Sequence, residues 1–261
     1  MEKIGIETSI VSISAPGVYF GNEYYAIDLS RQCNEFSAQI IDKFPNKFGS
    51  FAVLPLPNIE ASINEVKYAL DILKLDGVGL LSNINDMYLG DPVFDPIFSE
   101  LNRRKSVVFV HPNTSPTSPK TKVPQAIMEF MFNTTRAIAN LIYNRRLKKY
   151  SDIKFIFPHA GGTAPYLAWR ISMGEKRILK SLKNLYYDVA LTSVPFALRS
   201  LQELVDPSHI LFGSDFPFFP EPLITTMIER LENYDGFEIE EKRAIERDNA
   251  LSLFPRLQPI K

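Results

Sequence analysis

Cysteine, histidine and tryptophan are scarce in this sequence, and long apolar runs are missing. The 261 residues include one cysteine, Cys33, one tryptophan and three histidines. A single cysteine excludes an intrachain disulfide and is typical of a reducing compartment. No run approaches the 18 apolar residues of a membrane span, and no basic-then-apolar segment opens the chain. We therefore expect a cytoplasmic protein with no membrane partner.

An excess of charge of either sign is also missing. The chain has 29 Lys and Arg against 30 Asp and Glu, for a net charge of −1. This balance gives no electrostatic reason for binding nucleic acid. The length fits one α/β barrel, and no low-complexity tract or linker divides it. We expect a single domain over residues 1–261.

What the sequence does contain is a repeated alternation of two patterns. Short, nearly continuous apolar runs are typical of parallel strands that are covered on both faces. Between them, apolar residues recur at intervals of three and four, as in Ile63, Val66, Leu70 and Leu73, which is typical of helices. A longer apolar helix is expected over Ile127–Leu147. The seven predicted strands are Ser9–Ser14, Phe51–Leu56, Val78–Leu81, Val107–Val110, Phe155–Phe157, Leu185–Val189 and Ile210–Phe212.

Strands followed by helices predict βα units around a parallel sheet. A closed barrel of such units has eight strands, and this sequence supplies seven. We therefore expect an α/β protein, a (β/α)8 TIM-type barrel that lacks its first strand.

Ionisable residues follow four of the predicted strands: His111, His159, Asp188 and Asp215. In parallel α/β folds the carboxyl ends of the strands carry the functional residues. Imidazole and carboxylate are ligands of zinc and similar divalent ions, and a histidine beside such an ion can also transfer a proton. His111, His159 and Asp215 are therefore the candidate site.

Each of these residues has a simpler explanation when it is taken alone. His111 precedes Pro112 and can end a strand, and Asp215 can shape an Asx-turn. Three such residues at strand ends favour a shared function over three separate coincidences. We interpret Asp188 as a residue that ties down a neighbouring loop, and His209, which precedes its strand, as structural. Asn133-Thr134-Thr135 is expected to pack or cap a helix.

Four stretches of the sequence resemble a known family. They are Ser12–Gly17, Val108–Pro112, Phe155–Gly162 and Leu211–Phe218. Their order and spacing are similar to those of the amidohydrolase-related family, which includes aminocarboxymuconate-semialdehyde, γ-resorcylate and 6-methylsalicylate decarboxylases. The resemblance extends from Met1 to about Pro255, and its motifs are far more specific for the superfamily than for a substrate.

The resemblance implies a role for each candidate residue. His111 matches a metal ligand, Asp215 a carboxylate ligand, and His159 the histidine that positions metal-bound water and acts as acid or base. Arg170 matches an arginine that holds a substrate carboxylate in the neighbouring subunit of a homodimer; the alternative is a surface arginine. The implied cofactor is one divalent metal ion, expected to be zinc, and the implied partner is a small carboxylic acid.

The sequence departs from the family at its N-terminus. Family members begin with a His-x-His pair that supplies two metal ligands, and this sequence has no such pair. We expect a truncated or misassigned form of a normal enzyme; the alternative is a degenerate barrel with weakened metal binding.

Two reactions remain open from the residues. The fourth-strand end, Gly77–Asn83, has no lysine or glutamate to bridge two metals, so one metal is expected. With the resemblance, this favours non-oxidative decarboxylation of an aromatic or muconate-like carboxylic acid. Hydrolysis or hydration of a small acid is the second alternative, and an inactive barrel that acts as a binding protein is the third.

Overall fold

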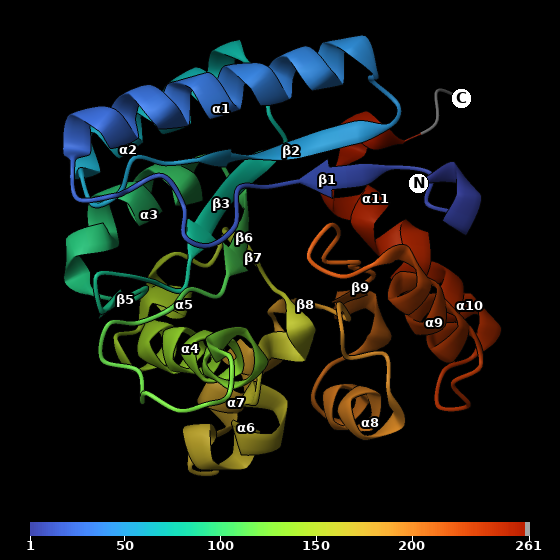
Figure 1. Cartoon of the computed structure of the whole chain (residues 1–261). Helices are drawn as coiled ribbons and strands as arrows, with labels where there is room; N and C mark the ends of the chain where they lie inside the picture. The colour runs from blue at the N-terminus through green and yellow to red at the C-terminus, as the bar shows by residue number, and fades with distance from the viewer. Residues whose placement is uncertain (259–261) are drawn as a thin grey trace. The chain divides into compact units, whose positions relative to one another are not determined.

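The computed structural model describes residues 1–258 and divides the chain into two compact units (Figure 1). Unit 1 is Met1–Phe155 and unit 2 is Ile156–Lys261. The boundary falls within strand β7, Lys154–Phe157. In the described part of the chain, no helix is long and apolar enough to cross a membrane.

The strands of unit 1 are parallel and follow chain order. Strand β1 pairs with β2, β2 with β3, and β3 with β6. The predicted strands in this part are confirmed, with small shifts of their ends. Their bounds are Ser9–Val11 for β1, Phe48–Val53 for β2, Gly77–Leu81 for β3 and Val107–His111 for β6.

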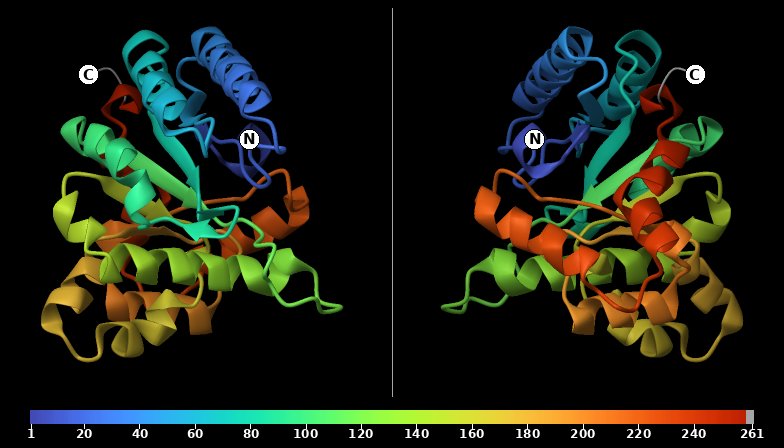
Figure 2. Two further views of the ribbon diagram at one scale, coloured as in Figure 1. Left: turned by 90° about the vertical axis from the view of Figure 1, so that its left-hand side faces the viewer. Right: turned by 90° about the vertical axis from the view of Figure 1, so that its right-hand side faces the viewer.

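Helices alternate with these strands. In Figure 2, α1 and α2 lie side by side, and α1 also packs on β2. Each begins at an asparagine, Asn22 or Asn58, whose side-chain oxygen accepts a hydrogen bond from a backbone N–H of the first turn. The helices of unit 1 are α1 Glu23–Lys43, α2 Ile59–Lys67, α3 Asp95–Arg103, α4 Gln125–Tyr143 and α5 Arg146–Lys149.

A buried polar group joins the first two helices to the carboxyl end of β2. Asn34 on α1 donates to the Val53 carbonyl and accepts from the Val53 amide, both at 2.9 Å. It also donates to buried Glu65 on α2, which pairs with Arg31 at 2.8 Å. Because buried polar groups need partners, this group fixes both helices against the strand end.

The predicted helix Ile127–Leu147 is confirmed over most of its length, but its predicted C-terminal end is wrong. Helix α4 stops at Tyr143, and α5 is a separate turn that begins at Arg146. Arg145 between them has a left-handed backbone, with φ of 59°, which no continuous α-helix can contain. A hairpin that the sequence did not predict, β4 Asn83–Ile84 with β5 Met87–Tyr88, lies between β3 and α3.

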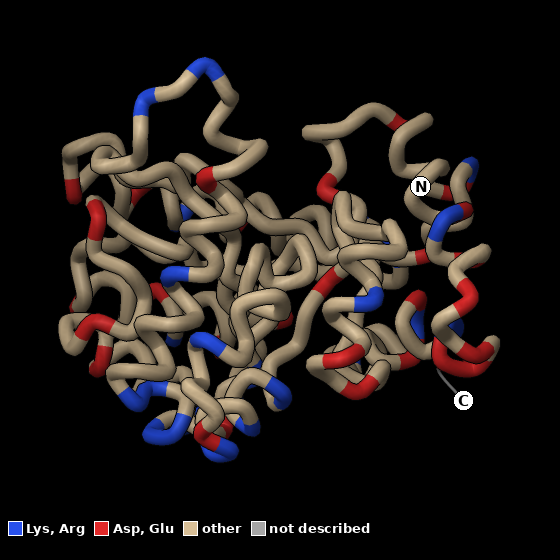
Figure 3. The backbone as a smooth tube through the Cα atoms, turned by 90° about the horizontal axis from the view of Figure 1, so that it is seen from below, with Lys and Arg blue, Asp and Glu red and all other residues tan. Residues whose placement is uncertain are grey.

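Unit 2 repeats the strand–helix alternation. Strand β7 pairs in parallel with β8, Tyr186–Asp188, and β8 with β9, Ile210–Leu211, which confirms the remaining predicted strands. Figure 3 marks the charged residues along the chain. Helix α7 carries four basic residues. The helices are α6 Ala164–Ser172, α7 Lys176–Lys183, α8 Pro195–Leu204, α9 Glu221–Glu232, α10 Ile239–Arg243 and α11 Asn249–Leu253.

Two glycines of β3 give a test of this strand packing. A Cβ on Gly77 would lie 2.5 Å from the Val107 carbonyl oxygen, whereas a Cβ on Gly79 would meet nothing closer than 3.6 Å. We predict that Gly77→Ala lowers the free energy of unfolding by about 1–3 kcal/mol, because β3 and β6 must separate, and that Gly79→Ala stays within about 0.5 kcal/mol. Urea denaturation measures both, and equal effects would contradict this packing.

Candidate metal and acid-base site

His111 ends strand β6 in unit 1, and its ring is held in one orientation. Its Nδ1 lies 2.7 Å from the Pro112 carbonyl oxygen, and the ring packs edge-on against Phe130 on α4 at a centroid distance of 5.9 Å. A carbonyl oxygen can only accept, so Nδ1 is the donor in this contact. Metal-binding histidines are commonly oriented in this way, by a backbone carbonyl on the other ring nitrogen.

The backbone that follows His111 is fixed by a buried amide network. The Asn113 carbonyl accepts hydrogen bonds from the side-chain amides of Asn133, at 2.7 Å, and Asn83, at 3.3 Å. The Asn113 amide donates to Ser82 at 3.0 Å. Asn133 is completely buried in α4 and accepts from the Tyr88 hydroxyl at 2.6 Å. The expected packing role of Asn133 thus includes support for the turn that holds the His111 ring.

His159 follows strand β7 in unit 2 and has an unusual backbone. His159 and Ala160 both have left-handed conformations, with φ of 57° and 53°, and the turn continues through Gly161 and Gly162 with positive φ. Such conformations are costly for residues other than glycine, and they persist where surrounding contacts enforce them. The side chain is only 4% exposed. The sequence Ala160-Gly161-Gly162 allows this sharp turn, and the turn sets the direction of the imidazole.

Asp188, at the end of β8, holds that turn in place. One carboxylate oxygen accepts hydrogen bonds from the His159 amide at 3.0 Å and the Ala190 amide at 2.9 Å. Burial raises the pKa of the Asp188 carboxyl, and the charge of His159 and the two amides oppose that rise. Gly213 leaves space for it, since a Cβ there would lie 2.8 Å from the carboxylate. The interpretation of Asp188 as a loop tie agrees with these contacts.

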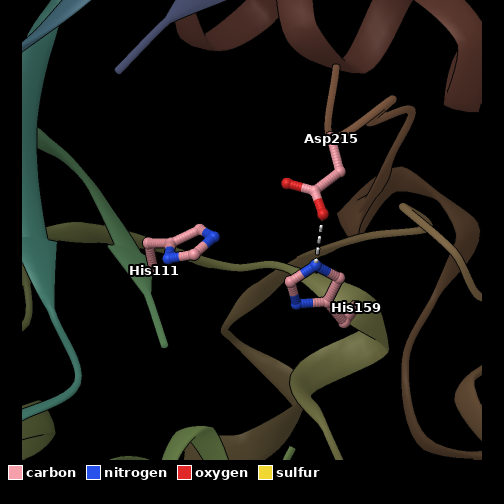
Figure 4. Close-up of side chains that lie close together, drawn as sticks. All are labelled: His111, His159 and Asp215. Atoms are coloured by element: carbon pink, nitrogen blue, oxygen red, sulfur yellow. Dashed lines mark ion pairs between the residues drawn. The ribbon is translucent and has the colours of Figure 1, made fainter. Parts of the chain in front are cut away.

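Asp215 faces His159 from the loop after β9. Its Oδ2 lies 3.5 Å from the His159 Nε2, as Figure 4 shows. Asp215 also has a left-handed backbone, with φ of 54°. In its turn, the Phe216 amide donates to the Ser214 hydroxyl at 3.3 Å, so a serine supplies the turn contact that we considered for Asp215.

The distance between the His159 Nε2 and the Asp215 Oδ2 fits two ligands of one metal ion. Two donors that each lie about 2.1 Å from one tetrahedral ion are roughly 3.4 Å apart. Imidazole nitrogen and carboxylate oxygen are also the donor types that zinc and manganese accept. These two atoms can therefore share an ion or, when the His159 Nε2 carries a proton, form an ion pair.

Two other residues considered in the sequence, Arg170 and His209, make no hydrogen bond or ion pair with His159 or Asp215 among those found within residues 1–258. Arg170 is on α6 and exposed, and no hydrogen bond or ion pair is recorded for it within residues 1–258. His209 contacts the Leu185 carbonyl at 3.1 Å and stacks on Tyr186 at 4.5 Å, which agrees with a structural role. Gly213, which makes room for Asp188, was not anticipated, although a glycine that precedes Ser214-Asp215 is a signal of close packing.

The contacts of Asp188 give a second prediction. Asp188→Ala removes the acceptor of two buried amides and should cost about 2–4 kcal/mol of unfolding free energy. Asp188→Asn keeps an acceptor oxygen and should lose less than about 1.5 kcal/mol. Urea denaturation monitored by circular dichroism compares the two, with Asp206→Asn, at an exposed turn, as the control. Equal losses in the Ala and Asn variants would show that the charge of Asp188, and not its hydrogen bonds, holds the turn.

Comparisons with known proteins identify the family of this chain. The family model described as Amidohydrolase matches residues 16–256. The 6-methylsalicylic acid decarboxylase of Penicillium expansum is 37% identical over 273 residues, which cover 98% of this chain and 84% of that protein. The crystal structure of an amidohydrolase II is 31% identical, with a TM-score of 0.92 over 97% of this chain and 85% of that one.

A solved structure of lower sequence identity contains a metal ion. A dihydroxybenzoic acid decarboxylase from a Polaromonas species, solved with manganese and the inhibitor 2-nitroresorcinol, is 21% identical. Its TM-score is 0.85 over 99% of this chain and 85% of that one. The predicted TIM-type fold class and the predicted family are both confirmed. This chain belongs to the amidohydrolase family, whose relatives of similar length include metal-dependent carboxy-lyases.

Proposed function

We propose that this chain catalyses the non-oxidative decarboxylation of a hydroxy-substituted aromatic acid, with 6-methylsalicylate as the first candidate. The observation that carries the proposal is the 37% identity to a 6-methylsalicylic acid decarboxylase over 98% of the chain. The oriented rings of His111 and His159 and the carboxylate of Asp215 support it, because this chemistry needs metal ligands and a proton donor. We also propose that residues 1–261 form one barrel domain, since the family model crosses both units.

The proposed metal ligands are His111 and Asp215. Each follows a parallel strand, and the donor types suit a divalent ion. When bound, the ion would supply positive charge that attracts the anionic acid. Zinc is the expectation from the sequence, and the manganese of the Polaromonas decarboxylase makes that ion the alternative.

His159 is the proposed proton donor. Decarboxylation of a phenolic acid needs a proton on the ring carbon that bears the carboxylate before the carbon–carbon bond breaks. The His159 Nε2–H gives this proton, carbon dioxide leaves, and the electrons of the broken bond restore the aromatic ring. The Asp215 carboxylate faces this nitrogen at 3.5 Å. Solvent then returns a proton to Nε2, so the net reaction consumes the carboxylate anion and one proton and yields the phenol and carbon dioxide.

Arg170 is the proposed carboxylate-binding residue, and it acts in the partner of a homodimer. On the same helix, Tyr166 and Trp169 are 84% and 74% exposed, and its C-cap residue Met173 is 77% exposed. Their spacing of three and four residues forms an apolar stripe next to Arg170, and Phe196 on neighbouring α8 is 81% exposed. Large exposed apolar groups of this kind mark interaction surfaces, and a two-fold interface would place Arg170 reciprocally. A cytoplasmic location belongs to the same proposal.

Two other functions lead to different products. A hydratase or hydrolase of a small acid would add water and release no carbon dioxide. An inactive barrel would bind the acid without any product. Product analysis by mass spectrometry, with carbon dioxide release measured in parallel, separates all three.

The metal and the proton donor can be tested separately. Removal of metal by a chelator should abolish decarboxylation of 6-methylsalicylate, and manganese or zinc should restore it. His111→Ala should weaken metal binding in calorimetry by at least about tenfold, because one ligand is lost. His159→Gln should bind the acid but lower kcat by about 10²–10⁴-fold, because the proton donor is lost. His209→Gln, which changes a structural histidine, is the control. Unchanged kcat in His159→Gln would reject its assignment.

The assembly can be tested with the exposed stripe. Trp169→Glu should convert a dimer to a monomer in light scattering, because a buried charge opposes association. Arg170→Lys should keep the dimer but raise KM for the acid by about tenfold, since lysine cannot form the two parallel hydrogen bonds of a guanidinium. Arg177→Lys, on neighbouring α7, is the matched control. A wild-type monomer at assay concentration would reject the shared site and leave Arg170 a surface residue.

A further inference from the structure

The peptide group between Pro112 and Asn113 connects the His111 ring to Ser82, the residue that follows β3. Its carbonyl oxygen, on Pro112, accepts a hydrogen bond from the His111 Nδ1 at 2.7 Å. Its N–H, on Asn113, donates to the Ser82 hydroxyl oxygen at 3.0 Å. One peptide group therefore contacts the ring at one end and Ser82 at the other.

These two contacts cannot change independently. A trans peptide group is planar, so its C=O and N–H bonds are rigidly coupled and point in opposite directions. Pro112 has a fixed φ and no N–H, which leaves rotation about its Cα–C bond as the soft motion that turns the carbonyl. That rotation would turn the whole plane, and it would take the N–H away from Ser82 as it took the carbonyl oxygen away from the ring.

Ser82 is itself held firmly in place. It is completely buried, and its backbone amide donates to the His111 carbonyl at 2.8 Å. Its hydroxyl oxygen also accepts from the Asn83 side-chain amide at 3.2 Å, and a hydroxyl has two lone pairs for these two donors. Ser82 thus holds the chain at both His111 and Asn113, in a place where water does not readily replace a lost hydroxyl.

The neighbouring amide side chains act on a different peptide group. Asn133 and Asn83 donate to the Asn113 carbonyl, at 2.7 and 3.3 Å, and this carbonyl belongs to the next peptide group along the chain. Among the contacts found within residues 1–258, the one that reaches the Pro112–Asn113 group from another strand is that of Ser82.

We propose that Ser82 is a positioning residue for His111. By holding the peptide N–H it keeps the carbonyl aimed at Nδ1, and so it fixes the direction of the imidazole. The consequence for metal binding rests on the proposed function, in which His111 is a ligand. Partners that orient a metal-binding histidine contribute about 10–100-fold to metal affinity. Because Ser82 acts through one peptide group, we expect an effect at the lower end, of about tenfold.

The His111 ring can be observed without metal, because the chain has only three histidines. In the full chain with isotopically labelled histidine, the His111 signals are those that disappear in His111→Gln. Ser82→Ala should shift the ring nitrogen signals of His111 and broaden the Nδ1–H signal, because the carbonyl acceptor can then turn away. Unchanged His111 signals in Ser82→Ala would overturn the proposal.

Further variants separate the lost acceptor from the lost volume. Ser82→Cys nearly keeps the volume, but sulfur accepts weakly, so it should resemble Ser82→Ala. Ser82→Thr keeps the hydroxyl and should restore the wild-type ring signals. Ser62→Ala removes an equally buried hydroxyl from α2 and is the matched control, which should leave the His111 signals unchanged. Equal responses to Ser62→Ala and Ser82→Ala would indicate a general loss of packing and reject the positioning role.

Calorimetry with manganese chloride gives the second readout. Ser82→Ala and Ser82→Cys should bind manganese about tenfold more weakly than the wild type, whereas Ser82→Thr and Ser62→Ala should bind it as the wild type does.

Decarboxylation of 6-methylsalicylate is measured beside the binding. Ring signals that respond to Ser82→Ala, in a protein that binds no manganese and releases no carbon dioxide, would support the positioning role and contradict the proposed function. Ring signals and manganese affinity that both stay unchanged in Ser82→Ala, in a protein that decarboxylates the acid, would overturn the positioning role and leave the proposed function in place.

Discussion

The hydrogen bond from the His159 amide to the buried Asp188 carboxylate is the constraint on which the site in unit 2 depends. A left-handed histidine followed by a left-handed alanine would relax in isolation, because two residues with side chains are strained there. Asp188 compensates the strain by accepting from the amide at the start of the turn, and Gly213 gives it room. The imidazole direction therefore depends on two residues that do not themselves touch a reacting atom in the proposed reaction.

The two site histidines are oriented by different means, and this separates their roles. The His111 ring is fixed through its own Nδ1, which donates to the carbonyl of the next residue, as is common for histidines that bind metal. His159 is fixed through its backbone, and its Nε2 faces the Asp215 carboxylate. One histidine is thereby suited to bind metal, and the other to gain and lose a proton. Equivalent residue types at strand ends acquire distinct chemistry from these local contacts.

The strands and the site residues were predictable because each depends on a local pattern. Short apolar runs predicted all seven parallel strands, and the residues that follow them predicted His111, His159 and Asp215. Helix α1 was missed because its buried face includes Ser30 and Asn34, which interrupt an apolar stripe. Two features that depend on tertiary contacts, the β4–β5 hairpin and the helix break at Arg145, were missed as well.

The hairpin β4–β5 and the break at Arg145 belong to that second group. The hairpin strands have two residues each, and their neighbourhood is held by contacts such as that between Tyr88 and Asn133, far apart in the sequence. At Arg145 the chain turns left-handed with no glycine or proline to signal it. Propensity and periodicity carry no information on either feature, because the contacts that determine them are tertiary.

The charges of the site explain why an acid substrate and a divalent ion belong together on this chain. In unit 2, His159 lies between two carboxyl groups, the buried Asp188 that holds its amide and Asp215 that faces its ring. An anionic substrate that approached this arrangement alone would meet repulsion in a region of low dielectric constant. A bound cation would turn this repulsion of the anion into attraction. An arginine from a partner subunit would increase the attraction. A divalent ion held near these carboxyl groups would therefore favour the binding of an acid, which agrees with the proposed function.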